Sequence, residues 1–500
     1  MKILLLRPKC QNERFGLGPF FRVEPLGLEY VASTLLTRGH DVQVADLRFE
    51  PSLEKLLLPH VPDVVGIACL HAVDIPDALD LARRIRVRAP DAFILVGGHS
   101  ASVFPEPFYR SDVDAVCIGD RDTLAAEVVE RLCNGASGRV AGVWYRGDSA
   151  VDCDSAGITA VGDQGPVDPC SASGIGRRIG GLDPWLLPAR HLVKPYRRNY
   201  LCVHKQPVWA VETARGCPYR CTFCSTWRRH ARRHLPRDID TVCRDLQAVG
   251  GNVFIVDDLF WYPRERSLEL ARELNRRGVT KDWILVQSRL DTVAENTELL
   301  EAWRPLARQF DVFLGFEAPT DAQLAELGKD LVVSTAEEGV RVARRFGYGV
   351  TGNFVVDPRW EEQDFEAMRQ MVDRLGLDRL GYTVLTPMPG TELFERLRDT
   401  IVDFDWSHYD MHHVLNEPRL GRERFFQLFV DAWRHNVLSS RYSLSRWWRW
   451  LGELTPGQIW VLLRVLIRTQ RLVRVSAYLA ETFPRTLPAA MGDELGTKRA

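Results

Sequence analysis

The chain has 500 residues, a formal net charge of −1 and 45% hydrophobic residues. This length predicts two or three domains, and the balanced charge predicts that nucleic acids are not partners. The start at Met1–Pro8 is too short an apolar run for a secretory signal, and no segment has about 18 uninterrupted apolar residues. A cytoplasmic protein with reduced cysteines is therefore expected.

Residues 1–135 alternate short apolar runs with helical patterns. This alternation predicts an α/β fold with a doubly wound parallel sheet. Strands are expected at Ile3–Leu6, Asp41–Ala45, Val64–Ala68, Phe93–Val96 and Ala115–Ile118, and helices at Leu26–Arg38, Ala78–Arg88 and Thr123–Leu132.

The motif Gly97-Gly98-His99-Ser100 follows the fourth of these strands. Ligands of doubly wound sheets bind beyond the carboxyl ends of the strands, and paired glycines allow close approach by a bulky ligand. A tight turn uses the same glycines, so the motif alone leaves both interpretations open.

Residues 136–204 are expected to form a linker region with a short hairpin at Val140–Tyr145. Residues 205–395 repeat the βα pattern six times, which predicts a partial, open (β/α)6 barrel with its active groups at the C-terminal strand ends. The expected strands are Val208–Val211, Val253–Val256, Ile284–Gln287, Val312–Gly315, Val350–Val355 and Gly381–Leu385.

Three cysteines, Cys217, Cys221 and Cys224, follow the first barrel strand with C-x3-C-x2-C spacing. Three thiolates can hold three irons of a 4Fe-4S cluster and leave the fourth iron open for a chelating substrate. The alternative is a zinc site completed by His230 and His234, although their spacing after Cys224 matches no usual zinc finger.

Residues 396–500 are expected to be helical and are rich in tryptophan. Trp447, Trp448, Trp450 and Trp460 lie among arginines, next to the apolar run Ile459–Arg468. Basic residues beside a helix of this kind are typical of a segment at a membrane interface, and they fit a helical subdomain packed on the barrel equally well. Both interpretations remain open.

The cysteine triplet, with Phe223 before its last thiol, resembles the radical S-adenosylmethionine (SAM) superfamily. The N-terminal sheet with its Gly97-Gly98 turn is similar to the cobalamin-binding domain that precedes many such barrels. Further motifs resemble the hopanoid C-3 methylase group of cobalamin-dependent radical SAM methyltransferases, namely Glu24-Pro25-Leu26-Gly27-Leu28-Glu29, Gly97-Gly98-His99-Ser100-Ala101-Ser102, Phe254-Ile255-Val256-Asp257-Asp258 and Cys224-Ser225-Thr226-Trp227.

This resemblance implies three cofactors: a 4Fe-4S cluster, S-adenosylmethionine and cobalamin. It implies that the cluster reduces SAM to a radical that removes hydrogen from the substrate, and that methylcobalamin then delivers the methyl group. A second SAM remethylates the cobalamin, and a flavodoxin- or ferredoxin-type electron donor is expected as a partner. The hard chemistry in such enzymes belongs to the cofactors.

The resemblance also implies roles by barrel position. Cys217, Cys221 and Cys224 are the implied iron ligands. Contacts to SAM are implied at the strand ends by Asp257 and Asp258 for the amino group, Gln287 and Arg289 for the carboxylate region, Glu317 for the ribose, Asn353 as a further polar contact, and the loop Thr386–Thr391 for adenine. Ordinary polarity at strand ends and helix capping are the alternative for each polar side chain.

One loop departs from the pattern of many cobalamin proteins, which carry an Asp-x-His-x-x-Gly motif whose histidine binds cobalt. The corresponding loop here, Asp46–Pro51, has no histidine. We therefore expect cobalamin to bind without histidine ligation, with Leu70 and His71 below the corrin and Gly97, Gly98, His99 and Ser100 also at its site. His71 is expected to donate or accept a hydrogen bond there, with cobalt ligation as the alternative.

The resulting hypothesis is methylation of an unactivated carbon in a hydrophobic substrate, with a hopanoid lipid as the preferred acceptor and peripheral association with the inner membrane face. The alternatives are another acceptor, such as a tetrapyrrole or antibiotic precursor, and a non-methylating radical rearrangement or ring formation. A methylthiotransferase would need a second cysteine triplet, but Cys10, Cys69 and Cys117 are scattered along the chain. A cobalamin-binding protein without catalysis is disfavoured by the intact triplet.

Overall fold

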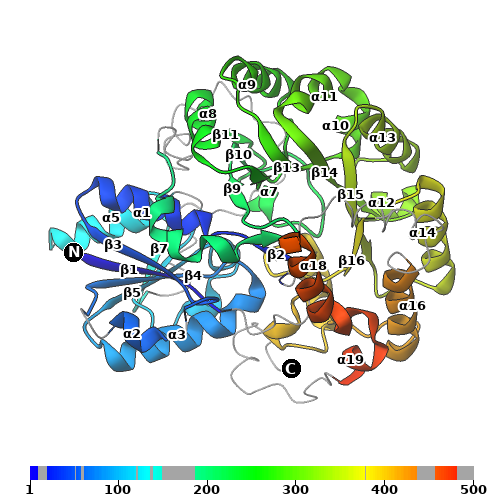
Figure 1. Cartoon of the computed structure of the whole chain (residues 1–500). Coiled ribbons are helices and arrows are strands. Elements are labelled where there is room, and N and C mark those ends of the chain that lie inside the picture. Colours follow the sequence, from blue (N-terminus) through cyan, green and yellow to red (C-terminus); the bar gives the residue numbers. More distant parts are fainter. Residues whose placement is uncertain are drawn as a thin grey trace.

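The computed structural model describes residues 1–9, 18, 20–50, 52–57, 61–119, 122–135, 139–148, 186–377, 379–435 and 456–480. Two sheets dominate this part of the chain, one in the N-terminal third and one in the centre (Figure 1). The α/β class predicted from the sequence is confirmed for both.

The first sheet has the strand order β3-β1-β4-β5-β6-β7. Its strands are β1 (Lys2–Arg7), β3 (Asp41–Asp46), β4 (Val64–Ala68), β5 (Phe93–Gly97), β6 (Ala115–Cys117) and β7 (Val143–Tyr145). The first five strands are parallel, and their apolar runs are buried because helices cover both faces. Helices α1 (Leu26–Thr37) and α5 (Leu124–Cys133) lie on one face, and α2 (Leu53–Leu57) and α3 (Ile75–Arg88) on the other (Figure 1).

The strand order of this sheet reverses between β1 and β4, so the crevice beyond their carboxyl ends is a topological switch point. Ligands of open α/β sheets bind at such points. The predicted hairpin at Val140–Tyr145 is wrong, because β7 pairs antiparallel with β6 instead of with a neighbouring strand of its own. The first sheet therefore takes in residues beyond 135.

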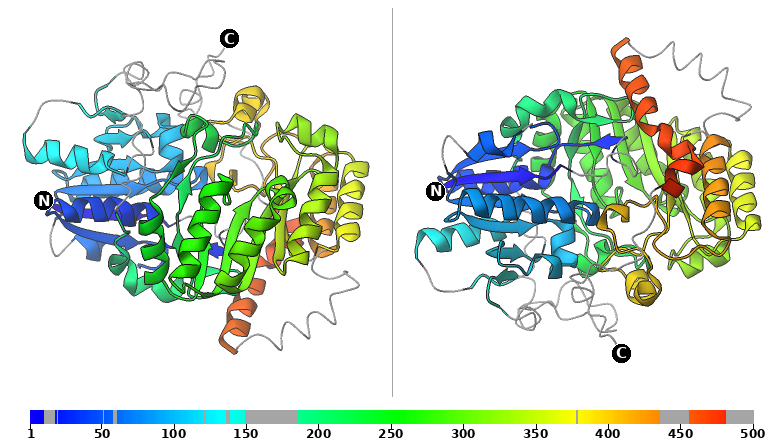
Figure 2. Two further views of the ribbon diagram at one scale, coloured as in Figure 1. Left: turned by 90° about the horizontal axis from the view of Figure 1, so that it is seen from above. Right: turned by 90° about the horizontal axis from the view of Figure 1, so that it is seen from below.

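The second sheet has six parallel strands in the order β9-β12-β13-β14-β15-β16. They are β9 (Trp209–Val211), β12 (Asn252–Ile255), β13 (Lys281–Ser288), β14 (Ala307–Glu317), β15 (Gly349–Val356) and β16 (Leu380–Val384). The helices between them cover the outer side of the sheet: α8 (Ile239–Ala248), α9 (Arg264–Arg276), α11 (Thr297–Trp303), α13 (Val333–Arg345) and α14 (Glu362–Leu375) (Figures 1 and 2). Within the described strands β9 and β16 do not pair, so the predicted open six-stranded barrel is confirmed.

The first sheet with its helices forms a first unit, and the barrel forms a second. Contacts from residues before and after the barrel in the sequence join the two units. The short strand β2 (Phe21–Arg22) pairs antiparallel with β8 (Leu201–Cys202), which directly precedes the barrel. After the barrel, Trp406 packs against Phe104 of the first unit, with ring centroids 5.5 Å apart. Residues on both sides of the barrel sequence therefore hold it against the first sheet.

The described residues of the C-terminal region are mainly helical, as predicted. Helix α16 (Arg422–Arg434) contributes buried side chains to the barrel core. Helices α18 (Pro456–Thr469) and α19 (Val475–Ala480) come after it in the sequence and lie on the outside of the barrel (Figure 2). Trp447, Trp448 and Trp450 lie outside the described residues. None of the helices that the structure describes is both long and apolar enough to span a bilayer.

Candidate active site between two sheets

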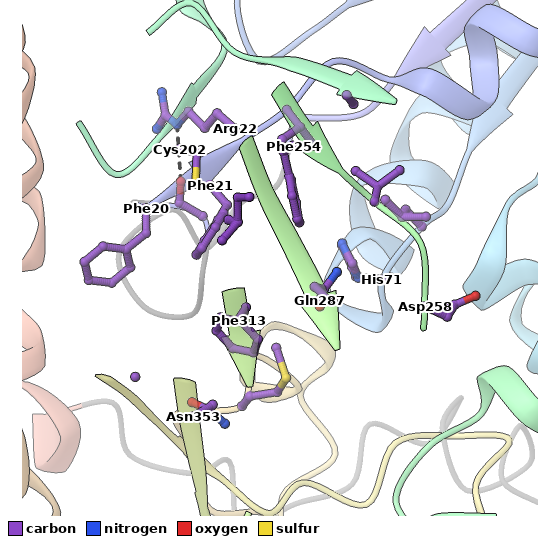
Figure 3. Close-up of a pocket in the computed structure, with 18 of the residues that line it drawn as sticks. Phe20, Phe21, Arg22, His71, Cys202, Phe254, Asp258, Gln287, Phe313 and Asn353 are labelled. Atoms are coloured by element: carbon purple, nitrogen blue, oxygen red, sulfur yellow. Dashed lines mark hydrogen bonds between the residues drawn. The ribbon is translucent and has the colours of Figure 1, made fainter. Parts of the chain in front are cut away.

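A cavity of about 2200 Å³ is lined by residues from both sheets. From the first sheet it takes the loops after β4 and β5, and from the barrel it takes the interior faces of β12 to β16. Ordinary small-molecule pockets measure roughly 300–1,000 Å³, so this space accommodates a large ligand or several together. Figure 3 shows Phe254 and Phe313 projecting from the strands into it.

The cysteine loop follows β10 (Ala214–Arg215) and is held by the backbone. Gly216 has φ +84°, and a Cβ atom there would lie 2.2 Å from the carbonyl oxygen of Arg233, so only glycine fits. Its N–H donates to the Asp258 carboxylate at 2.9 Å, and the Thr222 N–H donates to the Leu327 carbonyl at 2.9 Å. The loop is thus bound to two other barrel connections.

The three thiols are half-buried at the edge of this loop. Burial, with a smaller contribution from the nearby Cys224 sulfur, raises the pKa of Cys217 to about 11 and that of Cys221 to about 12. Metal-free thiols here resist ionisation, so iron binding must displace the protons.

Within the described residues, no three His, Cys, Asp or Glu side chains converge on one point as ligands of a single metal ion would. That arrangement does not support the zinc alternative with His230 and His234. A 4Fe-4S cluster needs no such convergence, because each thiolate binds a different iron. The donor set therefore fits a cluster.

Four of the predicted SAM-binding side chains line the cavity: Asp258, Gln287, Glu317 and Asn353. Figure 3 shows Asp258, Gln287 and Asn353 around its interior. Glu317 pairs with Lys329 at 2.6 Å and has φ +62°, a left-handed conformation that is strained for this residue. The amide nitrogen of Asn353 donates to Thr383 at 2.7 Å. Their contacts with SAM remain predictions.

Asp257 and Arg289 are engaged away from the cavity surface. The Asp257 carboxylate accepts the N–H of Thr213 at 2.6 Å, and burial raises the pKa of Asp257 to about 7. Arg289 pairs with Asp291 at 2.7 Å, and its guanidinium lies 3.7 Å from the centre of the Tyr219 ring. In this geometry both side chains support the cysteine loop and its neighbours, and their contacts with SAM stay predictions.

On the first sheet, Leu70 and His71 present their side chains to the cavity, and Leu70 is 44% exposed. The Asp74 carboxylate accepts the backbone N–H of His71 at 3.0 Å and pairs with Arg7 at 2.7 Å, across the switch point between β4 and β1. Enclosure by the protein lowers the pKa of His71, so its imidazole is neutral near pH 7. An exposed leucine beside a neutral imidazole suits a flat, largely apolar ligand face.

The predicted absence of a cobalt-binding histidine has a structural counterpart at Arg48. This side chain lines the cavity at the position two residues after Asp46, and Asp46 binds its guanidinium at 2.6 Å. Arginine has no free acceptor nitrogen at physiological pH and cannot serve as an ordinary metal ligand. Arg48 could not be assigned to the site from the sequence, because the loop pattern shows only that a histidine is missing.

Contacts within the chain already explain why the turn at Gly97-Gly98 needs a glycine. Gly98 has φ +113°, and a Cβ atom there would lie 2.5 Å from the Cys69 carbonyl oxygen. Ser100 fixes the same contact, since its N–H donates to the Cys69 carbonyl at 3.2 Å and its hydroxyl to the Leu70 carbonyl at 3.3 Å. Both glycines nevertheless line the cavity, so the turn and the ligand interpretations are compatible.

His99 connects this turn to the cysteine loop. Its Nε2 lies 2.7 Å from the Ser225 hydroxyl, next to Cys224, and its Nδ1 lies 3.2 Å from Arg229 of α7 (Thr226–Arg229). Because a guanidinium can only donate, Nδ1 must accept, and Nε2 then carries the proton that is donated to Ser225. Burial and the Arg229 charge lower the pKa of His99 to about 3, which keeps this neutral form.

Comparison with known proteins gives the same two domains as the structure. Residues 19–129 match the B12 binding domain, and residues 211–372 match the radical SAM superfamily. The hopanoid C-3 methylase of Methylococcus capsulatus is 30% identical over 419 residues, which cover 83% of this chain and 76% of that protein. The cytidylyl-2-hydroxyethylphosphonate methyltransferase of Streptomyces wedmorensis is 25% identical, over 84% of this chain and 86% of that one.

Among solved structures, the radical SAM methyltransferase TsrM from Kitasatospora setae, with cobalamin and a 4Fe-4S cluster bound, aligns with a TM-score of 0.60. It is 17% identical and covers 79% of this chain and 74% of TsrM, so this likeness concerns the fold. The extent of the match to hopanoid C-3 methylase, with the two domain matches and the cysteine triplet, decides the family. The chain belongs to the cobalamin-dependent radical SAM methyltransferases.

Proposed function

We propose that this enzyme methylates an unactivated carbon of a large hydrophobic acceptor, with a hopanoid lipid as the leading candidate. The observation that carries the proposal is the cavity, whose interior bears the aromatic side chains of Phe21, Phe254, Trp283, Phe313 and Tyr382. Aromatic rings provide broad apolar contact with a polycyclic body. The 30% identity with hopanoid C-3 methylase supports the same acceptor class.

The cofactors of the family supply a carbon-centred radical and a methyl group to this space. The chain's own part is to hold and separate them. Cys217, Cys221 and Cys224 would bind the cluster at one side of the cavity, while Leu70 and His71 would support the corrin at the other. The acceptor would lie between them, against the aromatic side chains.

The polar side chains at the strand ends have a second task in this proposal. Asp258, which already receives the Gly216 N–H, would receive the SAM amino group with its remaining acceptor capacity. Glu317 would accept from ribose hydroxyls, while Lys329 compensates its charge in the folded chain. The apolar walls exclude water, which protects a reactive radical from side reactions.

Two partners follow from the family chemistry as further proposals. Cluster reduction needs an external electron donor, for which a flavodoxin- or ferredoxin-type protein is suited. A lipid acceptor would reside in a membrane, so we also propose that the enzyme associates peripherally with one.

The test is anaerobic incubation of reconstituted enzyme with methyl-deuterated SAM and hopanoid lipids, followed by mass spectrometry. We expect labelled lipid together with deoxyadenosine. Cys221→Ala should abolish both and remove most of the iron, whereas Cys133→Ala, which changes an exposed thiol on α5, should leave both unchanged. Deoxyadenosine without any labelled product would contradict methyl transfer, and label in a tetrapyrrole but in no lipid would contradict the acceptor.

A further inference from the structure

We infer that helix α18 is a docking surface for an anionic lipid bilayer, and that it holds the mouth of the cavity at the membrane surface. The inference rests on the proposed function insofar as a lipid acceptor must leave a membrane to reach the cavity. It adds a defined surface, a defined partner and a route of entry.

Helix α18 is apolar on two opposite faces. Gln458, Leu462, Val465 and Leu466 lie on the face that lines the cavity. The opposite face carries Trp460, Leu463 and Ile467, at helical spacing, with exposed fractions of 62%, 46% and 64%. A helix of a soluble protein normally turns a polar face to water, so three large apolar side chains on the outer face need a partner.

The charge around the outer face identifies the kind of partner. Residues 456–480 contain four arginines, Arg464 and Arg468 on α18 and Arg471 and Arg474 just after it, and neither aspartate nor glutamate. Three of these arginines are exposed, and the fourth, Arg468, is half-buried. A helix with tryptophan and aliphatic residues on one face and arginines beside them is the pattern of an interfacial helix that binds anionic lipids.

A second copy of the chain fits this surface less well. If two copies met symmetrically through α18, the same arginines would face one another across the contact. Like charges at an interface oppose association, whereas the head groups of anionic lipids would neutralise them. The charge distribution therefore favours the bilayer.

The position of α18 explains why docking would help the reaction. Leu462 and Val465 are buried against the cavity on one side of the helix, while Ile467 and Trp460 point outward on the other. Figure 2 shows α18 (orange-red) on the outside of the barrel, with one end projecting past the body of the molecule. A lipid leaving the bilayer beside α18 would enter an aromatic cavity without crossing bulk water.

The test is co-sedimentation of the full-length, reconstituted protein with vesicles, without SAM or acceptor. We expect binding to vesicles of phosphatidylglycerol and phosphatidylcholine, weaker binding to phosphatidylcholine alone, and a decrease with added salt. Ile467→Asp should lower the partition coefficient on the order of tenfold or more, because it places a charge on the apolar contact. Val87→Asp is the matched control, since Val87 is 74% exposed on α3 and receives the same charge.

Three results would overturn the inference. The wild-type chain could fail to bind either kind of vesicle, or the two variants could weaken binding equally, which would assign it to overall charge. Sedimentation velocity could instead show a dimer that Ile467→Asp dissociates, with no vesicle binding, and the surface would then belong to a second copy. Vesicle binding as expected, combined with no labelled lipid in the methyl-transfer assay, would refute the proposed acceptor and leave the docking surface in place.

Discussion

His99 is a single side chain that connects the first unit to the barrel unit. It receives a hydrogen bond from Arg229 and donates one to Ser225, and both of these partners belong to the barrel unit, whereas His99 follows β5 of the first sheet. A neutral imidazole is the only form that can do both, because a protonated ring has no acceptor. We therefore regard His99 as a positioning residue that sets the turn relative to the cysteine loop.

The stability of this contact should depend on pH. The pKa of His99 is lowered to about 3 in the folded chain, against an ordinary value of about 6.5 in the unfolded chain. Above pH 6.5 neither state binds the proton, but below it the unfolded state does, so stability is lost as the pH falls from 6.5 towards 3. Between pH 7.5 and 5.5 the loss from this one group is on the order of 1 kcal/mol.

His99→Gln removes this titration and keeps a side chain that can donate and accept. We expect the melting temperature of the wild type to fall more between pH 7.5 and 5.5 than that of the variant, as measured by scanning fluorimetry. His204 and His234 also have lowered pKa values because of burial, but they are present in both proteins and cancel in the comparison. Equal decreases in the two proteins would contradict the neutral, bridging role.

At the scale of elements, the turn after β5 brings Gly97 and Gly98 to the cavity. Gly98 approaches the backbone after β4, and a Cβ atom at Gly97 would only make ordinary contact, 3.5 Å from the Cys117 Cβ. Gly97 also has no unusual φ, whereas Gly98 has φ +113°. The two neighbouring glycines therefore have different reasons to be glycine.

Gly98→Ala and Gly97→Ala form a matched pair that tests this difference. We expect Gly98→Ala to destabilise the first unit by roughly 1–3 kcal/mol, because the loops after β4 and β5 must separate. Gly97→Ala should be within about 0.5 kcal/mol of the wild type. Thermal unfolding of the cobalamin-free protein measures both, and equal effects would show that the close approach to Cys69 is not rigid.

The elements that sequence could predict are those with buried apolar runs. All six barrel strands and the five parallel strands of the first sheet are predictable from the sequence, because a strand covered on both faces must be apolar. The largest deviation is at β14, which begins at Ala307, whereas the predicted strand begins at Val312. The hairpin at Val140–Tyr145 failed, since the partner of an edge strand is chosen by tertiary contacts and not by the nearest turn. Helix α10 (Leu290–Glu295) is too short to show a helical repeat in the sequence.

The site was predictable to the level of the strand ends but not to the level of side-chain direction. Successive residues of an extended chain point to opposite sides, so Asp257 and Asp258 could not be ranked from their order alone. Asp258 lines the cavity, whereas Asp257 holds Thr213. Asp74 was missed for another reason, because its partner Arg7 lies 67 residues away and no local pattern links them.

At the scale of the whole molecule, a buried ion network joins the first unit to the barrel. Glu24, just before α1, binds Arg190 at 2.5 Å, pairs with Arg197, and accepts the backbone N–H of Ala210 in the barrel at 2.7 Å. Arg190 also binds Asp245 of α8 at 3.0 Å. The network holds the two walls of the cavity in one arrangement.

Glu24→Ala should therefore affect more than one unit. Removing one partner of a buried pair leaves the remaining charges unpaired and typically costs about 3–5 kcal/mol. We expect a large fall in melting temperature and separate melting of the two units in calorimetry. Glu130→Ala, which breaks a partly exposed pair with Arg38, is the matched control and should cost about 0–1 kcal/mol. Similar shifts in the two variants would contradict a network that couples the units.

The pairing of β2 with β8 has a consequence for how the chain is made. Residues 21–22 find their partner only at residues 201–202, and Glu24 finds Arg190 across 166 residues. During translation, where domains generally fold in order from the N-terminus, the first sheet can form early, but its seam with the barrel must wait until β8 leaves the ribosome. We expect the nascent chain to expose the apolar residues around β2 during that interval, which makes this seam the point where chaperones would be needed most.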